Sequence, residues 1–306
     1  MAQMEIIRCC VICVCLRISS LTLLSSATSE LGRWNELEEY ANTPGVQDAR
    51  LLMRAAAHRN EPWMVMRQCK EQLNACLPPD FVQEYHMLSA MLAVMDGIGD
   101  TVSMCKDTAE KEIAEAQRQI MDKWRMYPSI IGAAHLKLLQ SMHMVQELME
   151  SSQVMMGMHP TSAPYSHGLL TDMKNIVKTW RNRGAAILDG TMTMMDLFNI
   201  RKRMHVKLAK AFADWEARGV PGAQSPIPVH SAVQAQLMIA RTARTSRQYE
   251  MCAQQLDLVH TVPSVPLMDV HSKVIENLKL LRAIADDPRT DERRRQQVLL
   301  EIATIT

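Results

Sequence analysis

The sequence predicts an all-α chain, arranged as an α-solenoid of antiparallel helical hairpins. Glycine occurs 11 times in 306 residues and aromatic residues make up 4%, so the residue types that build strands and β-turns are scarce. Methionine, an unbranched helix former, occurs 25 times. Apolar residues recur at helical spacing between proline or glycine signals, and no segment alternates strictly as a half-buried strand would. We therefore expect about ten to twelve helices.

The first predicted helix begins after a turn at Gly32 and ends at Pro44-Gly45. Its apolar face consists of Trp34, Leu37, Tyr40 and Ala41. A second face begins with Leu52, Ala55 and Ala56.

The clearest helical pattern follows Pro78-Pro79. Apolar side chains recur there in steps of four and three residues, which places them on one stripe of a helix. Asp80 is the predicted N-cap, and Gly97 marks the end. The stripe consists of Phe81, Tyr85, Leu88, Leu92 and Met95.

Four further helical patterns follow after residue 130. The first is a long helix whose face is Ile131, Ala134, Leu138, Met142, Val145 and Met149. After an aperiodic loop at 159–168, the next face is Leu170, Met173, Val177 and Trp180. The last helices are predicted at about 231–259, with a break near Thr245-Ser246, and at about 270–285. A long connector is predicted at about 218–228, before the helix that begins at about 231, because this stretch contains three prolines and two glycines.

Short connections favour antiparallel neighbours, and no signal indicates a long-range return of the chain. These features favour stacked hairpins over one compact bundle. A tetratricopeptide-like repeat is visible only in outline, because no strict 34-residue period fits the whole chain.

The first 26 residues differ from the rest of the chain. They are apolar and rich in cysteine, with Cys9, Cys10, Cys13 and Cys15 among them. Three interpretations stay open: a secretory signal peptide, a non-native start, or an ordinary buried helix. The remaining cysteines are scattered, which argues against a disulfide framework and favours a reducing compartment. No apolar run reaches the ~20 residues that span a bilayer, so we expect no membrane partner.

The sequence predicts no catalytic, cofactor-binding or metal-binding residue and no cofactor. Gly97-Ile98-Gly99 lacks the third glycine and the preceding strand of a nucleotide site, so it is better explained as a helix-ending turn. Cys10 and Cys13 lack a second Cys/His pair for zinc. Two histidine pairs complete the candidates, and all four histidines are expected to be surface or partly buried residues: His159 with His167, and His135 with His143.

Two basic clusters fall on successive predicted helices. They are expected on the polar sides of these helices, where a solvated face is the simpler interpretation and a surface for phosphate or acidic peptides is the alternative. A formal charge of +1 and the absence of interleaved aromatic residues argue against a direct nucleic-acid site. The clusters are Lys174, Lys178, Arg181 and Arg183, then Arg201, Lys202, Arg203, Lys207 and Lys210.

Three segments resemble a known family. Residues 29–43, SELGRWNELEEYANT, are similar to a FAT-domain repeat of the phosphatidylinositol-kinase-related kinases, in which one helix ends at Leu-Gly and the next starts with Trp. Residues 171–183 and 256–270 resemble segments of the pseudokinase member of that family. The resemblance covers about residues 27–287. Within it, Trp34 and Trp180 are expected to be packing anchors on apolar stripes, and the prolines between His260 and Pro266 to turn the chain from one helix into the next.

The resemblance implies a non-catalytic scaffold in the nucleus. That family member is a large subunit of histone acetyltransferase complexes and receives transcription activators, so the implied partners are complex subunits and activators. A helical adaptor unrelated to chromatin is the alternative, and a secreted helical protein follows if residues 1–25 are a signal peptide. The expected organisation is an atypical segment at 1–26, a FAT-type repeat region at 27–287 and a C-terminal helix of a truncated repeat at 288–306. Because a solenoid hairpin buries its apolar face only against its neighbour, we expect an exposed apolar patch at one or both ends.

Overall fold

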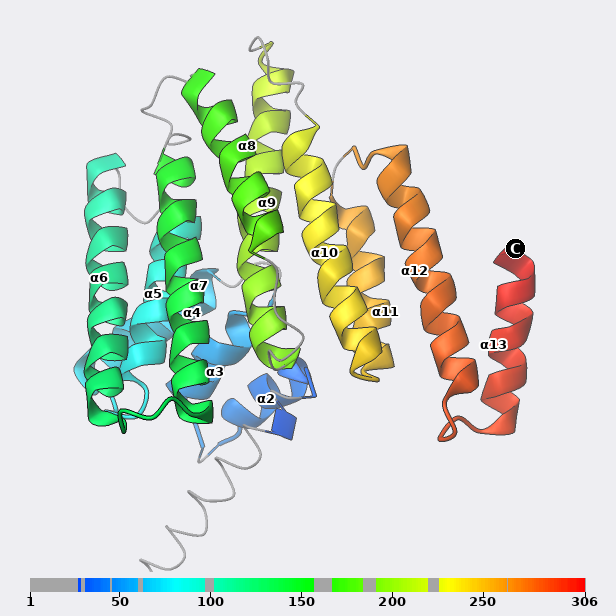
Figure 1. The fold of residues 1–306 in the computed structure, drawn as a ribbon, viewed down its shortest axis with the longest axis horizontal. Coiled ribbons are helices and arrows are strands. Elements are labelled where there is room, and N and C mark those ends of the chain that lie inside the picture. The colour runs from blue at the N-terminus through cyan, green and yellow to red at the C-terminus, as the bar shows by residue number, and fades with distance from the viewer. Residues whose placement is uncertain are drawn as a thin grey trace, which may run out of the picture. The chain divides into compact units, whose positions relative to one another are not determined.

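The computed structural model describes residues 27–28, 31–44, 46–59, 63–96, 102–156, 167–183, 191–219, 226–262 and 264–305. In these ranges the chain forms twelve α-helices, one 3-10 helix and no strand, which confirms the all-α prediction (Figure 1). The chain divides into two compact units, Met1–Leu77 and Pro78–Thr306.

The first unit contains three helices: α2 (Trp34–Ala41), α3 (Ala49–Ala56) and α4 (Trp63–Ala75). Asp48 is the N-cap of α3, where its carboxylate accepts a 2.9 Å hydrogen bond from the Arg50 backbone N–H. The predicted faces of α2 and α3 meet in one small core, with Trp34 packed on its edge and stacked on the His58 ring. The buried members of this core are Leu37, Ala41, Leu51 and Ala55.

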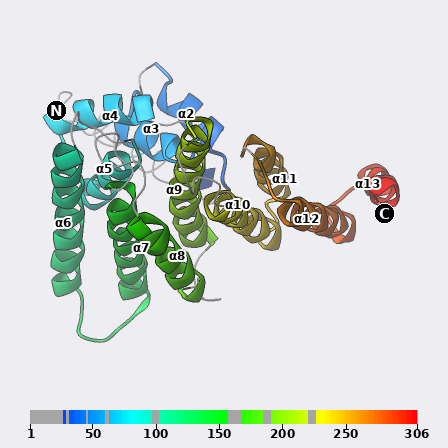
Figure 2. The same ribbon diagram turned by 90° about the horizontal axis from the view of Figure 1, so that it is seen from above.

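The second unit contains the remaining helices, and each packs mainly on its neighbours along the chain (Figure 1). Figure 2 shows α13 end-on while α6 lies along the page, so the helix axes turn relative to one another within this unit. The helices are α5 (Val82–Asp96), α6 (Val102–Met126), α7 (Ala133–Met156), α8 (His167–Asn182), α9 (Thr191–Ala217), α10 (Ile227–Thr245), α11 (Tyr249–Asp257), η1 (Leu258–Thr261), α12 (Leu267–Asp286) and α13 (Glu292–Ile305).

One core of the second unit lies between α9, α10, α11 and α12. The break predicted near Thr245-Ser246 is the turn between α10 and α11. There the N–H of Gln248 bonds the carbonyl of Ala243 at 2.8 Å, and Arg247 has a positive φ of 60°. This is a Schellman ending, which satisfies carbonyls that the helix leaves free. Pro266 takes an extended conformation immediately before α12, as expected for the proline that sets the start of that helix.

Two details of the predicted helices are wrong. Helix α5 begins at Val82, and the first helical carbonyl belongs to Phe81, which accepts from Tyr85 N–H at 2.8 Å, so Asp80 is not the N-cap. The buried face predicted for the long helix also fails at its start, because Ile131 precedes α7 and is 73% exposed, and Ala134 in the first turn is exposed as well. The 3-4 pattern continued across the turn between α6 and α7, although the backbone there is not helical.

Candidate interaction site between α7, α8 and α9

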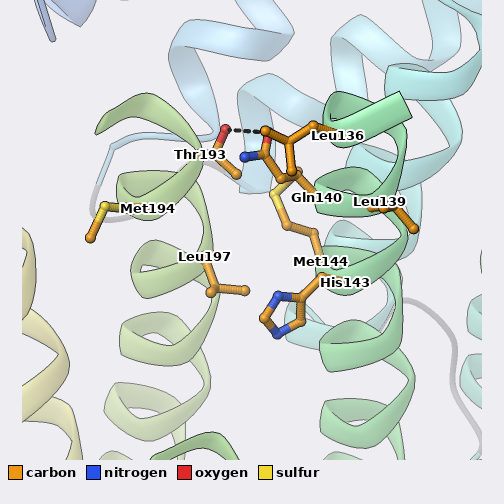
Figure 3. Close-up of a pocket in the computed structure, with 8 residues that line it drawn as sticks. All are labelled: Leu136, Leu139, Gln140, His143, Met144, Thr193, Met194 and Leu197. Atoms are coloured by element: carbon orange, nitrogen blue, oxygen red, sulfur yellow. Dashed lines mark hydrogen bonds between the residues drawn. The ribbon is translucent and has the colours of Figure 1, made fainter. Parts of the chain in front are cut away.

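A pocket of about 150 Å³ lies between α7 and α9. Figure 3 shows apolar side chains from both helices around it, with the imidazole of His143 between them. At one side Thr193 donates a 3.3 Å hydrogen bond to the Gln140 side-chain carbonyl. The lining consists of Leu136, Leu139, Gln140, His143, Met144, Thr193, Met194 and Leu197.

A buried ion pair lies one helical turn beyond the pocket. The side chain of Glu147 on α7 is fully buried, and it accepts hydrogen bonds from Arg201 of α9 at 2.8 Å (Nε) and 2.5 Å (Nη2). His143, which lines the pocket, has Nε2 3.1 Å from Glu147 Oε1. The pocket and the ion pair therefore share one side chain.

Helix α8 is attached to the same network at its C-terminal end. The Arg183 guanidinium donates to Glu150 at 3.0 and 2.9 Å, and Trp180 Nε1 donates to Glu150 at 2.8 Å. Burial alone would raise the pKa of Glu150, but the hydrogen bonds, led by that from Arg183, outweigh it and lower the pKa. Arg201 completes the connection, because its Nη2 donates to the Arg183 backbone carbonyl at 3.0 Å.

Trp180 is a packing anchor, as the sequence predicts. Its residue exposure is 2%, its ring lies 5.4 Å from the Arg201 guanidinium carbon, and His205 meets it edge-on at 5.7 Å. Aromatic rings and cations at such distances attract each other through the ring quadrupole. Three helices therefore meet at one tryptophan.

The two predicted basic clusters have different environments. Lys174, Lys178 and Arg181 are exposed on α8, in agreement with a solvated face. The prediction is wrong for Arg201, Lys202 and Arg203, which are buried because α9 packs against α5, α7 and α10. The sequence pattern of cations resembled a polar side, but most of this stretch of α9 is covered.

Burial changes the protonation of this stretch of α9. It lowers the pKa of Lys202 to about 7, with a smaller effect from the nearby Arg203. It lowers the pKa of Arg203 to about 9 and that of His205 to about 3, so His205 is neutral near pH 7.

A second set of buried carboxylates lies on α12 and bonds side chains of α10. Glu276 accepts from Arg241 at 3.2 Å and from Arg244 at 2.7 Å. Asp269 has its Oδ2 2.9 Å from His230 Nδ1. Such pairs fix which helix faces meet, because a buried charge without its partner is costly.

The remaining candidates contribute no site in the described residues. The prediction of a surface or partly buried residue is wrong for His135, which is buried against Trp124 with ring centroids 4.8 Å apart. Within the described ranges no group of three or more potential ligands is placed to hold a metal ion, and no helix is long and apolar enough to cross a membrane. Gly97-Ile98-Gly99, His159 and the four cysteines of residues 1–26 lie outside the described residues, as does the side chain of His167. Of the other cysteines, Cys69, Cys76 and Cys252 are free thiols.

The helices and their polar connections define a helical-repeat protein. Residues 49–291 match the FAT domain family, so the chain belongs to that family and is an α-solenoid of helical hairpins. The relatives are far longer than this chain, which spans about 7% of the length of each of the three described next.

Transcription-associated protein 1 of Caenorhabditis briggsae is 29% identical over 282 residues, which are 90% of this chain. Transformation/transcription domain-associated protein of Homo sapiens is 25% identical over 269 residues, or 84% of this chain. The SAGA complex/NuA4 acetyltransferase complex subunit TRA1 of Saccharomyces cerevisiae is 21% identical over 258 residues, or 82% of this chain.

Proposed function

We propose that this chain is a non-catalytic helical scaffold, acting as part of a transcription co-activator subunit of histone acetyltransferase complexes. The observation that carries the proposal is the similarity to transcription-associated proteins along more than four fifths of the chain. The yeast relative is named as a subunit of two such complexes. The FAT domain match supports the same role, because stacked helical repeats present long surfaces to protein partners.

The absence of enzymatic activity is part of this proposal. The amino-acid sequence contains none of the signatures that hold a nucleotide, its magnesium ions and a catalytic base. The buried ionisable groups Glu147 and Glu276 each bond cations of neighbouring helices. Titration of the purified chain with Mg²⁺ and ATP in a calorimeter tests this point. Micromolar binding would contradict it.

The proposed partners are subunits of acetyltransferase complexes and transcription activators, and the proposed location is the nucleus. The test is to express the tagged full chain in cells, to locate it by microscopy and to assay histone acetyltransferase activity in the purified material. Nuclear signal with co-purifying activity is expected. A Trp180→Ala chain serves as a control for dependence on the fold.

Two outcomes would contradict the proposal. Secretion of the chain would favour the signal-peptide interpretation of residues 1–25. A chain that binds other proteins and recovers no acetyltransferase activity would favour an adaptor unrelated to chromatin.

The organisation of the chain is proposed on the same basis. We infer a FAT-type repeat region at 27–287 with a connector at about 218–228, preceded by an atypical segment at 1–26 and followed by a C-terminal helix at 288–306. The family match at 49–291 and the end of α9 at Ala217, with α10 starting at Ile227, support this division.

A further inference from the structure

The exposed face of α8 carries three cations in one stripe. Lys174, Lys178 and Arg181 are exposed and follow one another at intervals of four and three residues. At about 100° per residue they fall within a sector of roughly 60° of the helix, and they extend over about 10 Å along its axis. Figure 1 shows α8 in front of α9, as an outer helix of the second unit. We name these three residues the α8 stripe.

No carboxylate in the described part of the chain forms an ion pair with the α8 stripe. Elsewhere on the surface, cations such as Arg118 on α6 pair with carboxylates of their own helix. The one acidic residue of α8, Asp172, lies about 160° around the helix from Lys174. Glu150 of α7, which bonds the end of α8, is already occupied by Arg183. The stripe therefore presents its charge to solvent.

The like charges of the α8 stripe oppose helix formation. Lys174 and Lys178 are four residues apart, and Lys178 and Arg181 are three apart, so neighbouring cations repel each other on one face. The helix macrodipole favours cations only in the last turn, which contains Arg181 and neither lysine. A surface pattern that opposes local stability without a compensating contact indicates a functional role.

The surroundings of the stripe favour a phosphate polymer over an acidic protein segment. Protein partners are held mainly by apolar anchors that enter the interface, whereas phosphate oxygens are held by cations and by the N–H and O–H groups of polar side chains. Every exposed residue between positions 171 and 182 is polar. These residues are Thr171, Asp172, Lys174, Asn175, Lys178, Thr179, Arg181 and Asn182.

The same face favours a duplex over a single strand. Single-stranded nucleic acids are bound through aromatic side chains on which the bases stack, while the backbone of a duplex is bound without them. Trp180 is the one aromatic residue between positions 171 and 182, and it is 2% exposed. The scarcity of aromatic residues that argues against a base-stacking site is therefore compatible with contact to a duplex backbone.

We propose that the α8 stripe contacts the phosphate backbone of a DNA duplex, with low affinity and without sequence preference. The inference rests on the proposed function, because DNA is the duplex that a chromatin-associated scaffold meets. Three phosphate contacts contribute about −2.7 to the slope of log K against log salt concentration, since each contributes about −0.9.

Fluorescence anisotropy tests the proposal with the purified full chain and a labelled duplex of about 20 base pairs, at salt concentrations from about 50 to about 200 mM. We expect saturable binding that weakens as salt rises. The variant Lys174→Gln/Lys178→Gln/Arg181→Gln is expected to bind about tenfold or more weakly at the lowest salt. Each single substitution is expected to make the salt slope shallower by about 1.

Matched variants separate the stripe from general attraction between cations and DNA. Lys111→Gln on α6 and Arg293→Gln on α13 each remove one exposed cation, and neither is expected to change affinity or salt slope. Circular dichroism verifies that each variant is folded. If the triple variant is unfolded, the three single variants decide the result.

Four results would overturn the proposal: no saturable binding of the duplex at the lowest salt, a salt slope that the stripe substitutions leave unchanged, an equal loss from Lys111→Gln, or tighter binding of a polyglutamate peptide than of the duplex. The last result would identify the partner as an acidic protein segment. Failed duplex binding with intact co-purification of acetyltransferase activity would reject this surface and leave the scaffold function standing. Duplex binding without that activity would reject the scaffold function and leave the surface standing.

Discussion

Two buried carboxylates in the second unit, Glu147 and Glu276, are matched by arginines from another helix. Glu147 and Glu276 have fully buried side chains, and arginines from α9 and α10 respectively bond them. Removing a charge from water costs several kcal/mol, so these pairs add less to stability than their short distances suggest. Losing one partner costs much more, because the remaining charge is then buried alone.

Glu147→Gln is therefore expected to lower the free energy of unfolding by about 3–5 kcal/mol, since it leaves the Arg201 guanidinium buried without a carboxylate. Urea unfolding followed by circular dichroism measures the change. The control is Glu110→Gln on α6, whose 3.7 Å pair with Lys106 is exposed on both sides, and which should change stability by less than about 1 kcal/mol. Equal losses of unfolding free energy at both sites would show that burial does not make the Glu147–Arg201 pair more important for stability than an exposed pair.

Removing the charge of Lys202 is expected to raise stability, whereas removing that of Glu147 lowers it. Burial lowers its pKa from 10.5 to about 7, so between these values the unfolded chain binds a proton that the folded chain does not. The contribution of Lys202 to stability therefore rises with pH across this window, by up to ~1.4 kcal/mol per pH unit, and is most unfavourable at pH 7 and below.

We expect Lys202→Met to stabilise the chain at about pH 7 and to gain little at about pH 10. The urea midpoints of wild type and variant, measured at both pH values, give the stability change caused by the substitution at each pH. The other titrating groups are the same in both proteins, so their contributions largely cancel. Lys174→Met, on the exposed face of α8, should show no such pH dependence. Destabilisation by Lys202→Met at about pH 7 would mean that the ammonium has a favourable role in the folded chain.

At the scale of elements, the described polar contacts of α8 lie at one end of the helix. Among the α8 side chains that the structure describes, Met173, Ile176 and Trp180 are the buried apolar ones, and Trp180 and Arg183 carry polar connections to α7 and α9 near the C-terminal end of the helix. A helix with few contacts opens at lower free energy than the core of a domain does. Trp180 supplies both the largest buried ring of α8 and one of its hydrogen bonds.

Trp180→Ala is expected to cost about 3–5 kcal/mol and to lower the hydrogen-exchange protection of α8 more than that of α10. Lys178→Ala on the exposed side of the same helix should cost less than about 0.5 kcal/mol. Uniform loss of protection over α8 and α10 would show that α8 does not open separately.

The helices themselves are largely predictable from the sequence, because the 3-4 spacing directly reports a buried stripe. The faces of α2, α5 and α8 are recovered in this way, as is the break at Thr245-Ser246. The candidate site cannot be predicted in the same way, because its residues are distant in sequence. Nothing local links Glu147 to Arg201, and a row of cations on α9 looks the same whether other helices cover it or water does.

At the scale of the whole molecule, the chain consists of two compact units, Met1–Leu77 and Pro78–Thr306. The first comprises 77 residues and has a core between α2 and α3, whereas the second comprises 229 residues and has a core between α9, α10, α11 and α12. Small domains bury a smaller fraction of their surface and are correspondingly less stable. The two units should therefore differ in stability.

We expect the segment 78–306, expressed alone, to fold cooperatively and to keep the helical circular dichroism of its share of the chain. All members of the core cluster that contains Leu237 and Leu280 belong to this segment. Thermal unfolding of the segment and of the full chain, followed at 222 nm, provides the comparison. We expect one thermal transition that both proteins share and a second transition, at lower temperature, in the full chain alone. The smaller unit unfolds at the lower temperature because it buries less apolar surface. A segment that is helical and yet unfolds without cooperativity would show that residues 1–77 are required for its packing, and the chain would then be one folding unit.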